Sequence, residues 1–205
     1  EIELKPLTIF VGPNASGKSS ILEALSLLAQ SIGERMYDYR GECYPCLVSY
    51  PSFEDIVHKR NPEKKMSIEI HMKLEESGRK ALSELGKEIN KRKLGVSIDE
   101  EITSVGYRYS CKMNGWQYAE QEIFCNEKKI IGIKREYDEK TSAIRDIFTF
   151  PPILKDAMPE DAPLILKPNA FVQRVNIVES AKPLNDFASK VVDIIVSRLK
   201  PEPNK

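Results

Sequence analysis

The chain contains 205 residues, of which 41% are hydrophobic and 30% are charged. This balance excludes a disordered tail, and 10 Gly with 13 Pro exclude a collagen-like or low-complexity chain. The 31 Lys and Arg cancel the 31 Asp and Glu, so net charge gives no whole-molecule case for binding nucleic acid, a membrane or an acidic substrate. The composition predicts an ordinary soluble globular protein.

No segment of the sequence predicts a membrane span. The longest mainly apolar run, residues 21–32, contains Glu23 and Gln30 and falls short of the roughly 18 residues that a spanning helix needs. Four Cys are too few for a secreted disulfide scaffold, and no leader pattern opens the sequence. We therefore expect a cytoplasmic protein with no membrane partner.

The first 33 residues predict a strand, a glycine-rich turn and a helix in immediate succession. Residues 4–11 form a short, nearly continuous apolar run that ends at Gly12, which is typical of a central parallel strand buried on both faces. Residues 18–32 then carry apolar side chains at spacings of three and four, and Gly33 closes this predicted helix. This order of elements is the opening of an α/β fold.

Residues 66–135 predict an antiparallel β subdomain. Strict alternation over 66–74 indicates a half-buried strand, and 76–93 indicates a polar helix with a thin apolar seam. Residues 102–113 and 116–125 predict a hairpin around Asn114-Gly115. The remaining predicted elements are a third strand over 129–135, a short helix over 53–59, a proline-rich connector over 149–169 with a short strand at 164–166, and an amphipathic helix over 184–199.

Residues 12–19, Gly-Pro-Asn-Ala-Ser-Gly-Lys-Ser, satisfy the phosphate-binding (Walker A) pattern G-x-x-x-x-G-K-[ST]. Gly12 and Gly17 allow successive backbone N–H groups to surround phosphate oxygens, and the helix that follows adds its N-terminal partial charge. Lys18 is predicted to place a charge between the β- and γ-phosphates, and the Ser19 hydroxyl is predicted to ligate Mg²⁺. The alternative is a glycine turn that merely joins a strand to a helix.

The sequence around this motif resembles the N-terminal lobe of the SMC/RecF/OLD-like ATPases. These are ABC-type P-loop ATPases of DNA repair, chromosome maintenance and phage defence. The resemblance is close over residues 4–32, looser to 74, and rests on Asn14, the doubled Ser19-Ser20 and the Leu-Glu-Ala-Leu helix that follows. It implies ATP and Mg²⁺ as ligands. The motif and the resemblance together predict nucleotide binding by Gly12, Pro13, Asn14, Ala15, Ser16, Gly17, Lys18, Ser19 and Ser20.

The resemblance also implies partners. Members of this family carry an LSGGQ-like motif, a Walker B Asp-Glu pair and a switch His on a C-terminal lobe, and no such set is found in these 205 residues. Residues 94–100 imitate a Walker B strand, but Gly95 and Ser97 interrupt it, and a polar turn is the better interpretation. We therefore expect residues 1–205 to be a single N-terminal lobe of an incomplete ATPase head. Its expected partners are its own C-terminal lobe and a second head in a nucleotide-dependent dimer, and DNA is a further candidate partner. Hydrolysis is expected to depend on the motifs of the C-terminal lobe.

Two other function classes remain open from the sequence. One is a non-hydrolysing regulatory or interaction module, in which bound nucleotide controls assembly with a partner. The other is a complete kinase- or GTPase-like enzyme that uses Asp99, which the Asn-Ala-Ser composition of the loop disfavours. The resemblance to an ABC-type head implies a catalytic glutamine that reaches Mg²⁺ and the attacking water, and Gln173 is the candidate for it. An ordinary surface amide is the default interpretation for Gln173, as it is for Gln117 and Gln121.

The cysteines, histidines and basic clusters are weaker candidates. Cys43 and Cys46 have C-x-x-C spacing, for which a metal site, a labile disulfide and plain thiols are the alternatives. The expected hairpin register pairs Cys111 with Tyr118 and Cys125 with Ser104, so these two Cys should not bridge. His58 and His71 are interpreted as solvated or structural. Basic residues gather over 58–65 and 80–93, where contact with DNA phosphates is weighed against an ordinary solvated face.

Overall fold

The computed structural model describes residues 2–4, 8–31, 55, 58–61, 64–111, 119–138, 143–152 and 182–199. Its centre is a five-stranded antiparallel sheet in the order β1-β2-β3-β4-β5, so each strand pairs with its neighbours in sequence. The strands are β1 (Met66–Lys73), β2 (Ser104–Cys111), β3 (Ala119–Cys125), β4 (Lys128–Asp138) and β5 (Ala143–Phe150).

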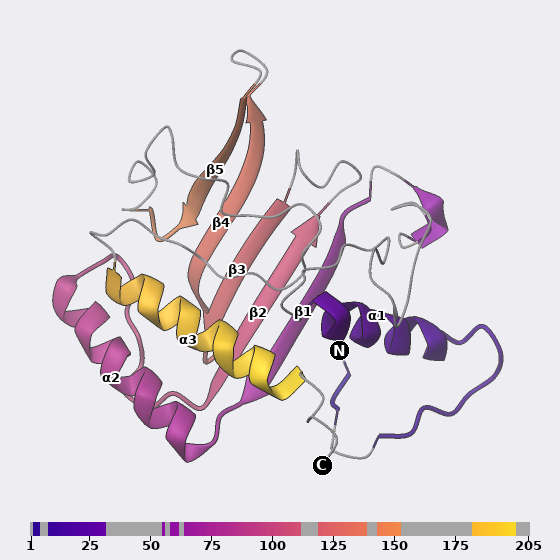
Figure 1. Ribbon diagram of the computed structural model, residues 1–205, viewed down its shortest axis with the longest axis horizontal. Coiled ribbons are helices and arrows are strands. Elements are labelled where there is room, and N and C mark those ends of the chain that lie inside the picture. Colours follow the sequence, from indigo (N-terminus) through magenta and orange to yellow (C-terminus); the bar gives the residue numbers. More distant parts are fainter. Residues whose placement is uncertain are drawn as a thin grey trace.

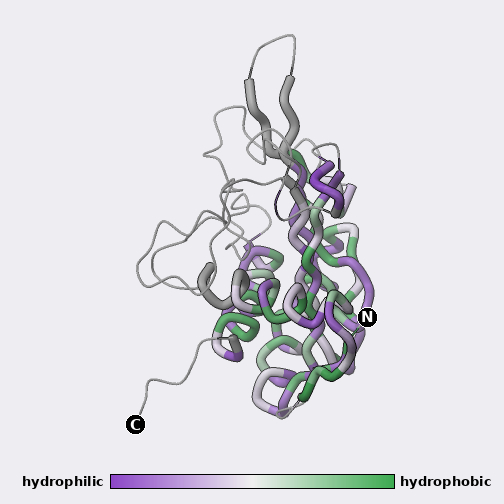
Figure 2. The backbone as a smooth tube through the Cα atoms, turned by 90° about the vertical axis from the view of Figure 1, so that its right-hand side faces the viewer, coloured by the Kyte–Doolittle hydropathy of each residue, from purple (hydrophilic) through white to green (hydrophobic). Residues whose placement is uncertain are grey.

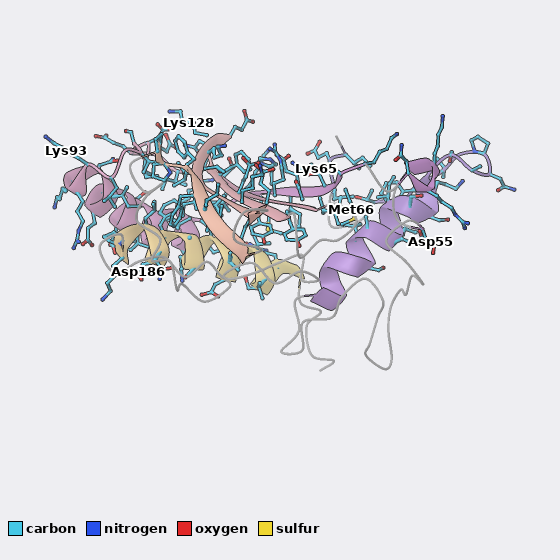
Figure 3. The ribbon with its side chains drawn as sticks, turned by 90° about the horizontal axis from the view of Figure 1, so that it is seen from above. Asp55, Lys65, Met66, Lys93, Lys128 and Asp186 are labelled. Atoms are coloured by element: carbon cyan, nitrogen blue, oxygen red, sulfur yellow. The ribbon has the colours of Figure 1, made fainter. Side chains whose placement is uncertain are left out.

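Two long helices cover one face of this sheet. They are α2 (Glu76–Arg92) and α3 (Lys182–Leu199), which pack against each other beneath the strands (Figures 1 and 3). A third helix, α1 (Lys18–Ser31), lies beyond β1 on the opposite side of the molecule from α2 (Figures 1 and 3). A short 3-10 helix, η2 (His58–Arg60), precedes β1. The architecture is therefore α/β, with an antiparallel sheet as its largest element.

The core lies between the sheet and the two covering helices. In β1, side chains alternate between half-buried and exposed, as the alternation over 66–74 predicts. Purple and green stretches alternate along the helical turns of the backbone tube, as they do in amphipathic helices (Figure 2). The largest fully buried side chains are Tyr107, Tyr109, Phe148, Phe187, Leu82, Ile89, Ile102, Ile123, Ile130 and Ile131.

The pairing register of β2 and β3 differs by one residue from the expected one. Cys111 faces Ala119 and Cys125 faces Val105, whereas the sequence-based register pairs them with Tyr118 and Ser104. That register would set Tyr107 opposite Glu122. The observed register sets Tyr107 opposite Ile123, which places both side chains on the buried face, because a slip of one residue moves a whole strand's side chains to the other face.

The sheet also extends beyond the predicted subdomain boundary at residue 135. The fifth strand, β5, was not predicted, because its apolar residues Ile144, Ile147, Phe148 and Phe150 do not alternate regularly. The register is continuous from Ile144 to Phe148, so the adjacent residues Ile147 and Phe148 lie on opposite faces. A register shift between Gly132 and Ile133 then changes the face on which Phe150 lies. Residues Glu136–Asp138 of β4 pair with β5 past the last residue that pairs with β3, so these two strands reach beyond the others (Figure 1).

The N-terminal segment contradicts the prediction of a buried central strand. Thr8–Val11 are not in a strand, and Ile9 and Val11 are 74% and 85% exposed. An apolar run becomes a central strand only when other strands pair along both its edges. Within the described ranges, β1 to β5 pair only with one another. The helix prediction is confirmed in extent, but Leu22 of α1 is 53% exposed and the helix is not largely buried over its described side chains.

The two longer helix predictions are confirmed. Residues 76–93 form α2 with Lys93 as its left-handed C-cap, and Leu82 and Ile89 of the predicted seam are fully buried. Residues 184–199 fall within α3, where Phe187, Val191 and Ile195 are buried as the periodicity indicates. The third-strand prediction over 129–135 falls within β4.

Several predicted elements lie partly or wholly outside the described residues. The Asn114-Gly115 turn and the strand at 164–166 lie wholly outside. Of the predicted connector over 149–169, the structure describes Pro151 and Pro152 after Phe150. In the region of the predicted 53–59 helix, it describes Asp55 and His58–Arg60.

Gly86 of α2 is a packing position that the hydrophobic pattern does not single out. A Cβ added there would lie 2.7 Å from Cγ2 and 3.1 Å from Cβ of Ile98, which is itself buried. We expect Gly86→Ala to lower the free energy of unfolding by about 1–3 kcal/mol, the usual cost of overpacking, despite the better helix propensity of Ala. Urea denaturation would measure the change.

Gly78 provides the matched control in the same helix. A Cβ there would lie 3.4 Å from Leu74 Cδ2, which is ordinary contact, so Gly78→Ala should stabilise the protein by up to about 1 kcal/mol. Equal effects of the two substitutions would show that the Ile98 contact does not limit this position.

Candidate phosphate-binding loop

The predicted phosphate loop precedes α1, whose first residue is Lys18. Three loop residues have positive φ: Gly12 at 157°, Ala15 at 62° and Gly17 at 88°. Such angles turn successive N–H groups toward one side of the backbone, which favours a concave anion site. The Ile21 amide donates to the Gly17 carbonyl over 3.2 Å, so the helical hydrogen bonds begin at the last loop residue.

The Lys18 ammonium lies back against the loop. It donates to the Gly12 carbonyl at 2.9 Å, to the Pro13 carbonyl at 2.7 Å and to Ser16 Oγ at 3.3 Å. These contacts bring the first and last parts of the predicted motif together around one cation. The sequence predicted Lys18 as the phosphate-binding cation, and its position over the loop is suited to that role.

The loop is accessible from solvent. Residues 12–16, Ser19 and Ser20 are exposed, while Gly17 and Lys18 are half-buried. The first N–H groups of α1 have no helical acceptors and point toward the loop, since this is a property of every helix N-terminus. A cation, free helical amides and exposed hydroxyls fit a Mg-nucleotide, with the Ser19 hydroxyl as the candidate Mg²⁺ ligand.

Asp99, the carboxylate of the Walker B-like segment, is bound to side chains outside the phosphate loop. Residues 94–100 form no strand, which agrees with the polar-turn interpretation. The Asp99 carboxylate accepts from Lys128 Nζ at 2.6 Å and from the Asn126 side chain at 3.3 Å. Hydrogen bonds from Lys128 and then Asn126 lower the pKa of Asp99. Lys128 lies at the far end of the sheet from α1 in Figure 3, so Asp99 does not serve the loop.

Of the three glutamines considered from the sequence, the structure describes one, Gln121. Gln121 is 1% exposed on the inner face of β3, so the expectation of a surface amide is wrong for it. It faces Tyr109 and Ile133 across the neighbouring strands, where burial of the strand's inner face decides its position. Gln117 and the catalytic candidate Gln173 lie outside the described residues.

The described cysteine has the environment of a structural thiol. Cys125 is buried and free, as the prediction of no bridge to Cys111 requires. Burial, followed by the nearby Asp99 charge, raises the pKa of Cys125 to about 11, so it is a weak nucleophile near neutral pH. Cys43 and Cys46 lie outside the described residues. Among the residues that are described, His, Cys, Asp and Glu form no group of three that could hold a metal ion.

The face of the sheet opposite the two helices carries a network of charges that sequence reasoning missed. Arg108 contacts Glu69 and Glu122, each at 2.6 Å, and Lys129 contacts Glu122 at 3.0 Å. His71 lies 2.5 Å from Glu69, in agreement with a structural role. Burial opposes ionisation of Glu69, but hydrogen bonds from Arg108 and His71 outweigh it and lower the Glu69 pKa. Cross-strand spacing of opposite charges could have indicated this network had the register been known.

Several members of the two basic clusters pair with carboxylates. Arg92 contacts Glu88 at 3.0 Å, Arg60 contacts Asp55 at 3.2 Å, and Lys65 contacts Glu120 at 2.6 Å. Such pairing reduces the local positive charge and favours the solvated-face interpretation over a built DNA site.

A family model described as AAA ATPase domain matches residues 1–191. The chain belongs to the AAA ATPase domain family. This match agrees with the resemblance of residues 4–32 to SMC/RecF/OLD-like ATPases, and membership of an ATPase family indicates nucleotide binding. Searches among curated proteins and among solved structures give no match. No helix in the described parts of this AAA ATPase domain combines the length and apolar character needed to cross a membrane.

Proposed function

We propose that this AAA ATPase domain binds Mg-ATP at residues 12–20. The single observation that carries the proposal is the Lys18 ammonium held over a loop with positive φ at Ala15 and Gly17, directly before a helix N-terminus. Lys18 would neutralise the β- and γ-phosphates, and the N–H groups of the loop and of the first turn of α1 would bind phosphate oxygens. The Ser19 hydroxyl would hold Mg²⁺, which stabilises charge on the phosphates when it is bound.

The remaining part of the proposal concerns assembly. We propose that a C-terminal lobe completes a P-loop NTPase fold of ABC type. We also propose that two such heads pair around bound ATP, and that ATP is hydrolysed only in this paired state. Two features support this proposal. Ile9 and Val11, next to the loop, present apolar side chains to solvent, which a second lobe could cover. Asp99 is bound to Lys128 and does not supply the catalytic carboxylate, which would come from another segment.

Light scattering tests the assembly. A protein that carries this domain together with its C-terminal lobe should be monomeric without nucleotide and dimeric with a slowly hydrolysed ATP analogue and Mg²⁺. If the pathway is DNA repair, chromosome maintenance or phage defence with DNA as partner, the paired form should bind duplex DNA with an affinity that falls steeply as salt rises. A monomer under all nucleotide conditions would contradict head pairing and favour the non-hydrolysing regulatory module.

A further inference from the structure

The hydrogen bonds of Lys18 leave no N–H of its ammonium for a phosphate. An ammonium has three donors, and the Lys18 group has three acceptors: two backbone carbonyls and Ser16 Oγ. A phosphate oxygen can therefore bind this cation with a full hydrogen bond only after one of these contacts is released. The Lys18 ammonium is satisfied by acceptors within the loop, which makes the release of one contact part of the binding step.

The three contacts differ in length and in freedom to move. The carbonyls of Gly12 and Pro13 accept over 2.9 and 2.7 Å, within the usual range for N–H···O bonds, and they belong to the backbone of the loop. The Ser16 contact is the longest, at 3.3 Å, and its acceptor is a hydroxyl that can leave by rotation about one side-chain bond. Ser16 is therefore the acceptor whose release requires the least rearrangement.

Ser16 is held close to the other end of the loop. Its Oγ would lie 3.1 Å from a Cβ built at Gly12, so the serine side chain crosses the short distance between the two ends of the motif. This placement brings the hydroxyl and the ammonium together on the same side of the loop. The serine is also exposed, so its hydroxyl can exchange this contact for water.

We propose that the Ser16 hydroxyl competes with the nucleotide for the Lys18 ammonium and thereby lowers the affinity of the loop for ATP. This inference rests on the proposed Mg-ATP binding at the same loop. Ser16 is a positioning residue: it acts through Lys18, and its contact is given up when the ammonium turns to the phosphates. Removal of the hydroxyl should leave the ammonium bound to the two carbonyls with one N–H available.

Calorimetric titration with Mg-ATP tests the competition. We expect Ser16→Ala to bind ATP about three- to ten-fold more tightly than the wild type, the range that corresponds to one hydrogen bond of ordinary net strength. Ser16→Thr restores a hydroxyl and should bring the affinity back toward the wild-type value. Ser77→Ala, at the start of α2, is the matched control and should bind as the wild type does.

The outcomes separate this inference from the proposed function. Weaker or unchanged binding by Ser16→Ala, with normal binding by the wild type, would overturn the competition and leave Mg-ATP binding intact. A merely structural role for the hydroxyl also predicts weaker binding, because the loop would be less ordered. A wild-type protein that binds no ATP at all would instead overturn the proposed function.

Discussion

Replacement of Lys18 by alanine is expected to lower the affinity for ATP by about 100-fold or more. The substitution removes the cation that two carbonyls hold over the loop, and with it the charge-assisted hydrogen bonds to the phosphates. The backbone N–H groups of the loop and of α1 remain, so weak residual binding of a phosphate is still possible. Isothermal titration calorimetry with Mg-ATP measures the difference directly.

Lys80→Ala is the control for loss of a lysine as such. Lys80 is exposed on α2, away from the loop, so its removal should leave ATP affinity unchanged. Equal affinity of Lys18→Ala and the wild type would mean that the loop is only a connection between the N-terminal segment and α1. The family membership would then have to be reconciled with a nucleotide site elsewhere.

Replacement of Asn126 by alanine is expected to lower the free energy of unfolding by about 2–4 kcal/mol. Asn126 Oδ1 accepts from the Thr103 amide at 2.9 Å, from Thr103 Oγ1 at 3.1 Å and from the Ser104 amide at 3.2 Å. Its Nδ2 donates to the Glu101 carbonyl at 2.6 Å and to Asp99. Alanine leaves these backbone groups without their partner, and unsatisfied groups cost more than the bonds contribute. Chemical denaturation would give the change.

Asn126→Gly separates the side chain from the backbone. Asn126 has φ 46°, which alanine adopts poorly and glycine adopts freely. Because we attribute the loss to the hydrogen bonds, the glycine variant should be nearly as unstable as the alanine variant. Recovery of wild-type stability with glycine would assign the effect to backbone conformation instead.

The sheet illustrates what the sequence could and could not predict. Met66–Lys73 alternate so regularly that β1 follows from the pattern alone, because only one face of that strand is buried. The sequence-based register of β2 and β3 assumed a two-residue turn at Asn114-Gly115, and it differs by one residue from the observed register. β5 was missed because its apolar residues do not alternate: Ile147 and Phe148 are adjacent and lie on opposite faces, and a bulge beside Gly132 then changes the face of Phe150.

The proposed phosphate loop could be predicted from sequence because its residues are adjacent in the chain. Spacing alone identified Gly17 and Lys18, and the positive φ of Gly17 and the contacts of Lys18 agree with the expected loop. The strand before it was a weaker prediction. The apolar side chains of Ile9 and Val11 favour burial, but they do not show whether other strands pair with this segment. The Ser16 contact depends on the fold of the loop, and no pattern of residue types indicates it.

The buried core has a consequence for how ligands should be detected. The core side chains described lie between Leu74 and Ile195, in the sheet, its two covering helices and the segments that connect them, whereas the loop lies at residues 12–19. A ligand raises a melting temperature only when its site is lost in the same transition that is observed. A thermal-shift screen, whose dye reports the melting of that core, therefore tests whether the loop and the core melt together. A higher melting temperature with saturating ATP would show a single transition, and an unchanged one would show that the loop is lost separately.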